Sequence, residues 1–253
     1  MAILDVKHCT KSFGGLVAVK DLNITMEEGA LYGLIGPNGA GKTTIFNLIT
    51  GVYAPDEGTI TLAGTEIQGR KPSAIAKLGI SRTFQNIRLF HSMTVLENLK
   101  VSRHMRRTQG LFDVILRTPK LRAEEERIEH DAMELLKIFH LDDRAHDHAK
   151  NLPYGSQRRL EIARALMTAP KLLLLDEPAA GMNPQESVEL MHLIEQCREQ
   201  FRIAVLLVEH NMKVVMGVCE RIQVIDYGET IALGAPKEIQ ANPRVIEAYL
   251  GGA

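Results

Sequence analysis

A glycine-rich segment early in the chain has the residue types and spacing to bind the phosphates of a nucleotide. It reads GPNGAGKTT, and its first eight residues fit the pattern G-x-x-x-x-G-K-[ST]. Glycines let successive backbone N–H groups point into one concavity, and the positive end of a following helix adds attraction for an anion. In such a loop the lysine reaches the β- and γ-phosphates, and the next hydroxyl ligates Mg²⁺. The predicted loop residues are Gly36, Pro37, Asn38, Gly39, Ala40, Gly41, Lys42, Thr43 and Thr44.

Two adjacent carboxylates lie where phosphoryl transfer needs them. Asp176 and Glu177 follow Leu172–Leu175, a run that predicts a buried strand, and they precede Pro178. Sheets of α/β proteins place ligand chemistry at the carboxyl ends of their strands. We therefore predict Asp176 in the magnesium shell. Glu177 is predicted to be the general base that orients and deprotonates the attacking water.

Hydrophobic patterns predict the elements that position these residues. Leu31–Ile35, Leu172–Leu175 and Ile203–Val208 are continuous apolar runs, typical of strands buried on both faces of a parallel sheet. The first run leads into the glycine loop, and Lys42–Thr50 reads as a helix that Gly51 ends. Asn183-Pro184-Gln185-Glu186 carries a capping residue, a first-turn proline and an acidic third residue, so a helix is predicted to start there.

The rest of the chain predicts two additions to this core. Short strands at Ile3–Val6, Leu22–Met26 and Thr59–Leu62 suggest a small antiparallel sheet. Between Glu97 and Lys150 apolar residues recur at helical spacing, which predicts a helical insertion. We predict one α/β domain over residues 1–253, with a nucleotide-binding core and β subdomain in 1–95 and 160–253 and a helical subdomain in about 96–159. The helical spacing is carried by Ile128, Ala132, Leu135, Leu136 and Phe139.

Composition excludes several classes of protein. The 253 residues are 45% hydrophobic and 24% charged, as in a soluble globular chain, and the net charge of -1 provides no overall field for nucleic acid or anionic lipid. Cys9, Cys197 and Cys219 are far apart and favour free thiols in a reducing cytosol over a metal site. No apolar run approaches the roughly 20 residues of a membrane span, and the amino terminus does not resemble a signal peptide.

The Asp-Glu-Pro strand end, together with a downstream strand that ends in Val208-Glu209-His210, resembles an ATP-binding-cassette (ABC) ATPase. The resemblance covers essentially the whole chain. It implies a P-loop NTPase core of the RecA-like type with a mostly parallel sheet, an amino-terminal antiparallel β subdomain and an inserted α-helical subdomain. It also implies ATP and Mg²⁺ as ligands and ATP hydrolysis as the activity.

The same resemblance implies roles for residues that would carry none alone. Phe13, in KSFGG, matches the aromatic that stacks on adenine. Gln85, in SRTFQN, matches the glutamine that links metal and water to the transporter partner, and His210 matches the switch histidine that contacts the γ-phosphate. An isolated phenylalanine or histidine is more often structural. Ala180–Asn183 occupies the loop through which two such subunits communicate, with Asn183 where the family more often has aspartate.

Leu152-Pro153-Tyr154-Gly155-Ser156 occupies the place of the family's LSGGQ signature, which completes the ATP site of a second subunit. Only Leu152 and Gly155 match that pattern. Pro153 replaces the serine that contacts the γ-phosphate across the dimer, Tyr154 replaces a glycine, and Ser156 replaces the glutamine. Because Pro153 also lacks a backbone donor, this element is expected to bind a partner's nucleotide less well. The altered signature favours a pair of two different ATP-binding subunits.

Longer strings, such as KTTIFNLITG, DEPAAGMNP and NPRVIEAYLG, resemble ATP-binding subunits of branched-chain amino acid importers. That implies ATP-dependent dimerisation at the cytoplasmic face of the inner membrane, as a peripheral subunit driving two membrane permeases. A periplasmic solute-binding protein would feed the transporter, and nucleic acid would not be a partner. Urea or amide importers, a lipid exporter, a soluble ABC ATPase with a non-membrane partner and an ATP-binding switch remain alternatives.

The basic stretch from Arg103 to Arg122 has two interpretations: a solvated helix face, or a contact with lipid headgroups or a permease.

Overall fold

The computed structural model describes residues 2–103 and 119–250, and the chain divides into two compact units. The core unit comprises residues 1–82 and 171–253, and the helical unit comprises residues 83–170.

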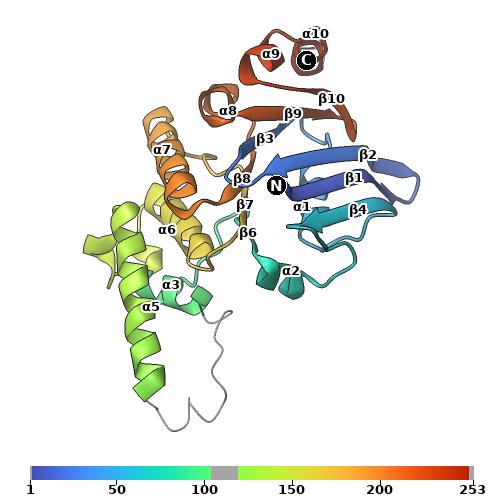
Figure 1. Cartoon of the computed structure of the whole chain (residues 1–253). Helices are drawn as coiled ribbons and strands as arrows, with labels where there is room; N and C mark the ends of the chain where they lie inside the picture. Colours follow the sequence, from blue (N-terminus) through green and yellow to red (C-terminus); the bar gives the residue numbers. More distant parts are fainter. Residues whose placement is uncertain (1, 104–118, 251–253) are drawn as a thin grey trace. The chain divides into compact units, whose positions relative to one another are not determined.

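A six-stranded sheet forms the centre of the core unit, in the order β10-β9-β3-β8-β7-β6 (Figure 1). The four pairings from β9 through β3, β8 and β7 to β6 are all parallel, and only β10 is antiparallel to its neighbour. Every residue of β3, β7 and β8 is buried, which explains their unbroken apolar sequences. The predicted mostly parallel sheet is therefore confirmed. Its strands are β3 (Leu31–Ile35), β6 (Ile80–Arg82), β7 (Leu172–Asp176), β8 (Ala204–Val208), β9 (Arg221–Asp226) and β10 (Glu229–Gly234).

Helix α7 of the core unit begins at the capping residue and first-turn proline that the sequence predicted. The Asn183 side chain accepts from the Glu186 N–H at 2.9 Å, and the Glu186 carboxylate accepts from the Asn183 N–H at 3.0 Å. This capping box starts α7 with Pro184 in its first turn, as predicted. The helices are α1 (Lys42–Ile49), α2 (Pro72–Leu78), α7 (Pro184–Phe201), α8 (Met212–Val218), α9 (Pro236–Gln240) and α10 (Pro243–Leu250).

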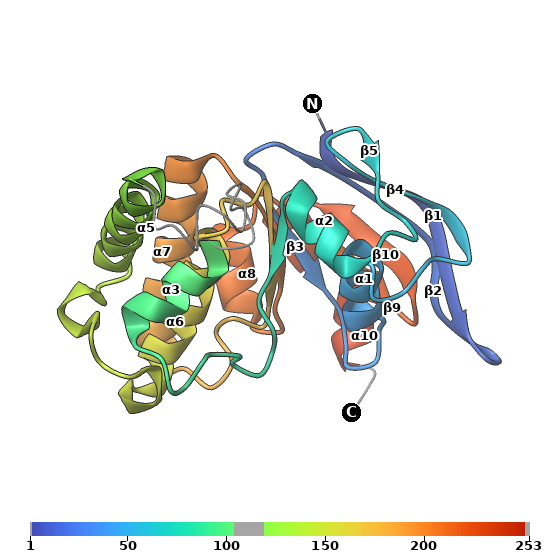
Figure 2. The same ribbon diagram turned by 90° about the horizontal axis from the view of Figure 1, so that it is seen from below.

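The predicted amino-terminal antiparallel sheet is present, with four strands in the order β2-β1-β4-β5 (Figure 2). β1 and β2 are much longer than the sequence predicted, since bulges between the pairs Val6–Ile24 and Cys9–Leu22 interrupt the period-2 alternation that reveals a strand. The four strands are β1 (Ala2–Phe13), β2 (Leu16–Glu27), β4 (Glu57–Leu62) and β5 (Thr65–Glu66).

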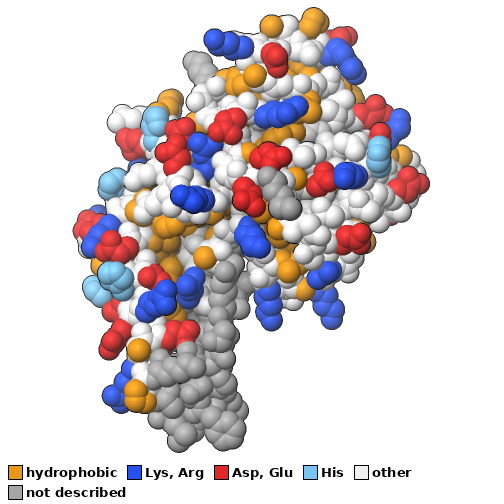
Figure 3. Space-filling view, viewed as in Figure 1, with side chains coloured by type: hydrophobic (Ala, Val, Ile, Leu, Met, Phe, Trp, Pro, Cys, Tyr) orange, Lys and Arg blue, Asp and Glu red, His pale blue; other side chains and the backbone are white. Residues whose placement is uncertain are grey.

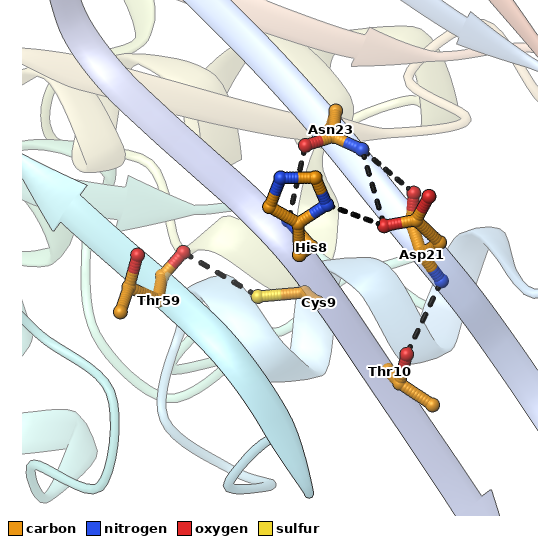
Figure 4. A network of polar contacts seen from close by, with 6 residues as sticks. All are labelled: His8, Cys9, Thr10, Asp21, Asn23 and Thr59. Atoms are coloured by element: carbon orange, nitrogen blue, oxygen red, sulfur yellow. Dashed lines mark hydrogen bonds and ion pairs between the residues drawn. The ribbon is translucent and has the colours of Figure 1, made fainter.

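Side chains hold the bulge between β1 and β2 (Figure 4). His8 and Asp21 both have positive φ, 50° and 48°, and the His8 Nδ1 lies 2.7 Å from an Asp21 carboxylate oxygen. The Asn23 side chain accepts from the His8 N–H at 3.0 Å, and the Thr10 hydroxyl accepts from the Asp21 N–H at 3.2 Å. These polar groups replace ladder hydrogen bonds that the bulge removes.

The helical unit buries the residues that the sequence placed at helical spacing. Ile128, Ala132, Leu135, Leu136 and Phe139 are all buried. The elements are α3 (Val95–Arg103), α5 (Pro119–Ile138), α6 (Tyr154–Leu166) and the short 3₁₀ turns η2 (Asp142–Arg144) and η3 (Ala149–Asn151). Most of the basic stretch falls in residues 104–118, which lie outside the described part of the chain.

Acidic and basic side chains are interspersed over the face drawn in Figure 3. The three cysteines are free and buried, and burial raises the pKa of Cys9 to about 11 and those of Cys197 and Cys219 to about 12. Within residues 2–103 and 119–250, none of the helices combines the length and the apolar character of a membrane span.

Candidate nucleotide-binding site

The phosphate loop joins β3 to α1 and holds its lysine in a partly enclosed place. The Lys42 ammonium donates to the carbonyl oxygens of Gly36 at 2.5 Å and Pro37 at 2.8 Å, and the residue is only 8% exposed. Burial lowers the pKa of Lys42, while the negative charges of Glu177 and Asp176 raise it. The site therefore contains a desolvated cation near two carboxylates.

The amino terminus of α1 fits an anion. Gly41 is its N-cap, no side chain caps the helix, and its first turn carries no acidic residue. The first backbone N–H groups of a helix lack intrahelical partners, so a phosphate can accept from them. Asn38, Gly39 and Thr43 are exposed, whereas Gly36 and Ala40 are buried. The residues present thus fit the phosphates of a nucleotide.

Close backbone contacts explain why this loop needs glycine. A Cβ on Gly36 would lie 2.0 Å from the Ile225 carbonyl oxygen, and a Cβ on Gly41, whose φ is 106°, would lie 2.5 Å from that of Ala18. The Gly228 N–H donates to the Ala40 carbonyl at 3.0 Å, while the Gly228 carbonyl accepts from the N–H of Lys20 at 2.9 Å. The turn between β9 and β10 therefore supports the loop from outside. Sequence reasoning missed Gly228, whose one signal is a Tyr-Gly pair between two apolar runs.

Gly228→Ala is expected to destabilise the core unit by about 1–3 kcal/mol and to weaken nucleotide binding. Gly228 has φ 81°, and an added Cβ would lie 2.7 Å from the Ala18 carbonyl oxygen, so the turn must shift against the loop. Urea unfolding and titration with a fluorescent nucleotide measure the two effects. Gly69→Ala is the matched control, because Gly69 has φ 72° but open space around its Cβ position. Equal losses of nucleotide affinity in both variants would contradict the support role.

Asp176 ends β7, and an arginine from the neighbouring edge strand orients it. The Arg82 guanidinium donates to the Asp176 carboxylate at 2.9 Å and to the Asn47 side-chain oxygen at 2.7 Å. It also lies over the Phe46 ring, 5.3 Å from the centroid. The carboxylate is thereby tied to α1, the helix that carries Lys42 and Thr43. Arg82 and Asn47 were not predicted, because nothing in their local sequence marks them.

A magnesium ion fits this donor set. The described residues contain no group of three or more His, Cys, Asp or Glu side chains that could hold a metal ion by themselves. Mg²⁺ is usually held by one or two carboxylates together with substrate phosphates and water, rather than by a dedicated protein cage. Asp176 and the exposed Thr43 hydroxyl supply donors of that kind.

Glu177 and His210 come together from the ends of adjacent strands. The Glu177 N–H donates to the Val208 carbonyl at 2.8 Å, which joins the loop after β7 to the end of β8. The His210 Nδ1 lies 3.6 Å from a Glu177 carboxylate oxygen. The His210 side chain is 60% exposed and that of Glu177 is 17% exposed, so both remain accessible. Glu177 has φ 48°, a left-handed conformation that is unusual for glutamate.

Phe13 ends β1 and keeps an open aromatic surface. Phe13 is 41% exposed, and Tyr53 contacts its ring edge-on with centroids 5.0 Å apart and an interplanar angle of 70°. The Lys11 ammonium lies 5.6 Å from the Phe13 centroid. Phe13 is thus a partly exposed ring that other side chains hold in place, and its exposed part suits stacking on a base.

Phe13→Ala is expected to weaken adenine-nucleotide binding by about 5- to 150-fold, because stacking of a base on an aromatic ring contributes about 1–3 kcal/mol. Isothermal titration with ADP measures the change. Phe201→Ala is the matched control, since Phe201 is similarly exposed, at 43%, but ends α7. An unchanged dissociation constant for Phe13→Ala would remove Phe13 from the site.

The other predicted residues belong to the helical unit. Gln85 is exposed, and Pro153 is the N-cap of α6, with Leu152 buried before it and Tyr154 exposed after it. Within this unit, the fully buried Arg158 donates to the carbonyl oxygens of Phe84 at 2.8 Å and Gln85 at 2.7 Å. Arg158 therefore ties the Gln85 segment to α6, the helix that begins within the signature position, a connection that the sequence did not reveal.

Comparisons with known proteins agree with this geometry. A family model described as ABC transporter matches residues 19–180, and one described as branched-chain amino acid ATP-binding cassette transporter matches residues 229–253. The chain is 48% identical to the high-affinity branched-chain amino acid transport ATP-binding protein LivG of Salmonella typhimurium, over 99% of this chain and 98% of LivG. It is 47% identical to BraF of Pseudomonas aeruginosa, a protein of the same description, over 99% of this chain and 98% of BraF.

A solved structure is similar over almost the whole chain. The ADP conformation of MJ1267, an ATP-binding cassette of an ABC transporter, matches with a TM-score of 0.86 and 31% identity, over 99% of each chain. The phosphate loop, the carboxylate pair and the parallel sheet all fall within this match. The chain therefore belongs to the ABC transporter family, as one of its nucleotide-binding ATPase cassettes.

Proposed function

We propose that this chain is the ATP-hydrolysing subunit of an importer for branched-chain amino acids. Its near full-length likeness to LivG and BraF supports the transport role and the choice of solute. The proposed hydrolysis is supported above all by one observation in the core unit. His210 Nδ1 lies 3.6 Å from a Glu177 carboxylate oxygen, and the negative charges of Glu177 and Asp176 raise the pKa of Lys42 in the phosphate loop against the effect of burial.

The core-unit residues divide the work of binding and hydrolysis. Phe13 stacks on adenine, while Lys42 and the backbone N–H groups of the loop bind the β- and γ-phosphates. Thr43 and Asp176 would hold Mg²⁺, which would neutralise charge on the phosphates, and Gln85 of the helical unit is the further ligand that we propose. Glu177 accepts a proton from the attacking water, and His210 contacts the γ-phosphate.

A second ATP-binding subunit completes each site. Residues 152–156 of this chain face the partner's nucleotide, and the partner supplies its own signature to the Lys42 loop. No acidic residue lies in the first turn of α6, which keeps the helix end compatible with phosphate, but Pro153 contributes no N–H. A heteromeric pair with two unequal sites follows. Ala180–Asn183 carries contacts between the subunits.

The partners are two membrane permeases, which Gln85 and its neighbours engage on the cytoplasmic face of the inner membrane, and indirectly a periplasmic solute-binding protein. Uptake of radiolabelled leucine, isoleucine and valine by cells lacking this chain tests the proposal. Uptake is expected to fall and to return with the unaltered chain but not with Glu177→Gln. Unchanged branched-chain uptake with a loss of urea or amide uptake, or of lipid export, would assign the ATPase to another transporter.

A further inference from the structure

Glu209 is a buried carboxylate to which the functions proposed above give no role. It lies between Val208, the last residue of β8, and His210, and only 1% of its surface is exposed. A carboxylate that leaves water must be compensated by hydrogen-bond donors or a positive charge. Its partners therefore indicate why the chain keeps an acidic residue at this position.

Backbone groups on both sides of the catalytic pair donate to this side chain. A Glu209 carboxylate oxygen accepts from the Ala179 N–H at 2.9 Å, and the Asn211 N–H donates to the same side chain. Ala179 lies two residues after Glu177, and Asn211 directly follows His210. One carboxylate therefore connects the loop that carries Glu177 to the loop that carries His210.

The hydrogen bonds of Glu209 suit a fixed tie between the two loops. Burial and the charge of Glu177 raise the pKa of Glu209 above its usual value, although the Ala179 N–H, the charge of His210 and the Asn211 N–H lower it in part. The buried side chain is committed to backbone donors, so it does not contact nucleotide itself.

The segment that Glu209 holds is short and already constrained. The Ala180 N–H donates to the Glu177 carbonyl at 3.1 Å, and the Met182 N–H donates to that of Ala179 at 3.1 Å. Glu177 adopts φ 48°, which an L residue keeps only when its surroundings enforce it. Besides the backbone bond from Glu177 to Val208, the Glu209 side chain is a second link that enforces this conformation.

We propose that Glu209 is a positioning residue that fixes the Glu177 loop against the His210 loop, so that the two side chains address the γ-phosphate as one unit. This inference rests on the proposed ATPase function. Since Ala179 directly precedes Ala180–Asn183, the same link sets the start of the loop that contacts the second subunit. Glu209 would then transmit the position of the catalytic pair to that loop.

Glu209→Gln is the test, carried out on the full chain assembled with its partner subunits. The amide keeps the size of the side chain, but its NH₂ group cannot accept from a backbone N–H, so one of the two links is lost. We expect kcat to fall about 10- to 100-fold while the nucleotide dissociation constant stays within about twofold, because the phosphate loop is untouched. In a His210→Ala background the effect of Glu209→Gln should shrink, because the two residues act together.

Gln223→Ala is the matched control. Gln223 is also 1% exposed, and it accepts from the Tyr32 hydroxyl at 2.7 Å and donates to the Thr230 hydroxyl at 2.7 Å, away from both loops. Gln223→Ala should lower the midpoint of thermal unfolding without a comparable fall in kcat. Equal falls of kcat in the two variants, or full additivity with His210→Ala, would overturn the positioning role.

Hydrogen exchange keeps the proposal testable if Glu209→Gln does not fold. In the unaltered chain the Ala179 and Asn211 amides should be protected, and rapid exchange of either would overturn the link. Glu177→Gln distinguishes a failure of the Glu209 inference from a failure of the proposed function. The Glu209 inference alone would be wrong if the unaltered chain is active, Glu177→Gln is inactive and Glu209→Gln is fully active. If the unaltered assembly has no ATPase activity, the proposed function would be wrong as well.

Discussion

Glu177→Gln is expected to lower ATP turnover by about 10²–10³-fold while ATP binding survives. The Glu177 carboxylate is partly buried, 17% exposed, and 3.6 Å from His210 Nδ1. We propose that it is the base for the water that attacks the γ-phosphate. Glutamine preserves the shape and the backbone hydrogen bond to Val208 but cannot accept the proton. Binding groups such as Lys42 are unchanged, so the loss should fall on kcat.

Steady-state phosphate release and equilibrium binding of labelled ATP, both in the assembled transporter, measure the two halves of this prediction. Glu189→Gln is the control, since Glu189 is an exposed glutamate on α7. Its turnover should equal that of the unaltered chain. Turnover of Glu177→Gln within about twofold of the unaltered chain would remove Glu177 as the base and point to another proton acceptor.

Lys42→Ala is expected to weaken nucleotide binding by about 10²–10³-fold. Lys42 is 8% exposed, and its ammonium is held by the Gly36 and Pro37 carbonyls at the start of α1. Removing one partner from a buried charge pair costs about 3–5 kcal/mol, and Lys42→Ala would remove the positive partner of the bound phosphates. No other basic residue lies in the phosphate loop between Gly36 and Thr44 to replace it.

Titration with ATP and with ADP measures this loss, and Lys77→Ala is the control, because Lys77 is an exposed lysine of α2.

The stability of the nucleotide-free chain should respond differently to Lys42→Ala. Burial lowers the pKa of Lys42, which means that the charged form is less favourable in the folded chain than in the unfolded one. The lysine charge therefore reduces stability at pH values below its folded pKa. The midpoint of thermal unfolding should not fall in Lys42→Ala, and a large fall would mean that affinity is lost through unfolding.

Local sequence patterns were sufficient to predict the core of the fold and to propose the residues of the candidate site. Leu31–Ile35 and Leu172–Leu175 are buried on both faces, and strands of that kind must be apolar throughout. The capping box of Asn183 and Glu186 and the glycine loop before Lys42 are likewise complete within a few residues. A function that depends on adjacent residues leaves a readable signal in the sequence.

Tertiary structure decided the supports around these residues. Arg82 donates to Asp176 across 94 positions of the chain, Gly228 donates to Ala40, and Glu209 reaches Ala179 across 30 positions. Each is an ordinary residue in its own neighbourhood, at a strand end or in a turn. A hydrogen bond between distant segments exists only after the parallel strands have brought their carboxyl ends to one edge of the sheet. Residue types and spacing therefore determined which groups we propose to bind and hydrolyse a nucleotide, and folding of the sheet determined which groups hold them in place.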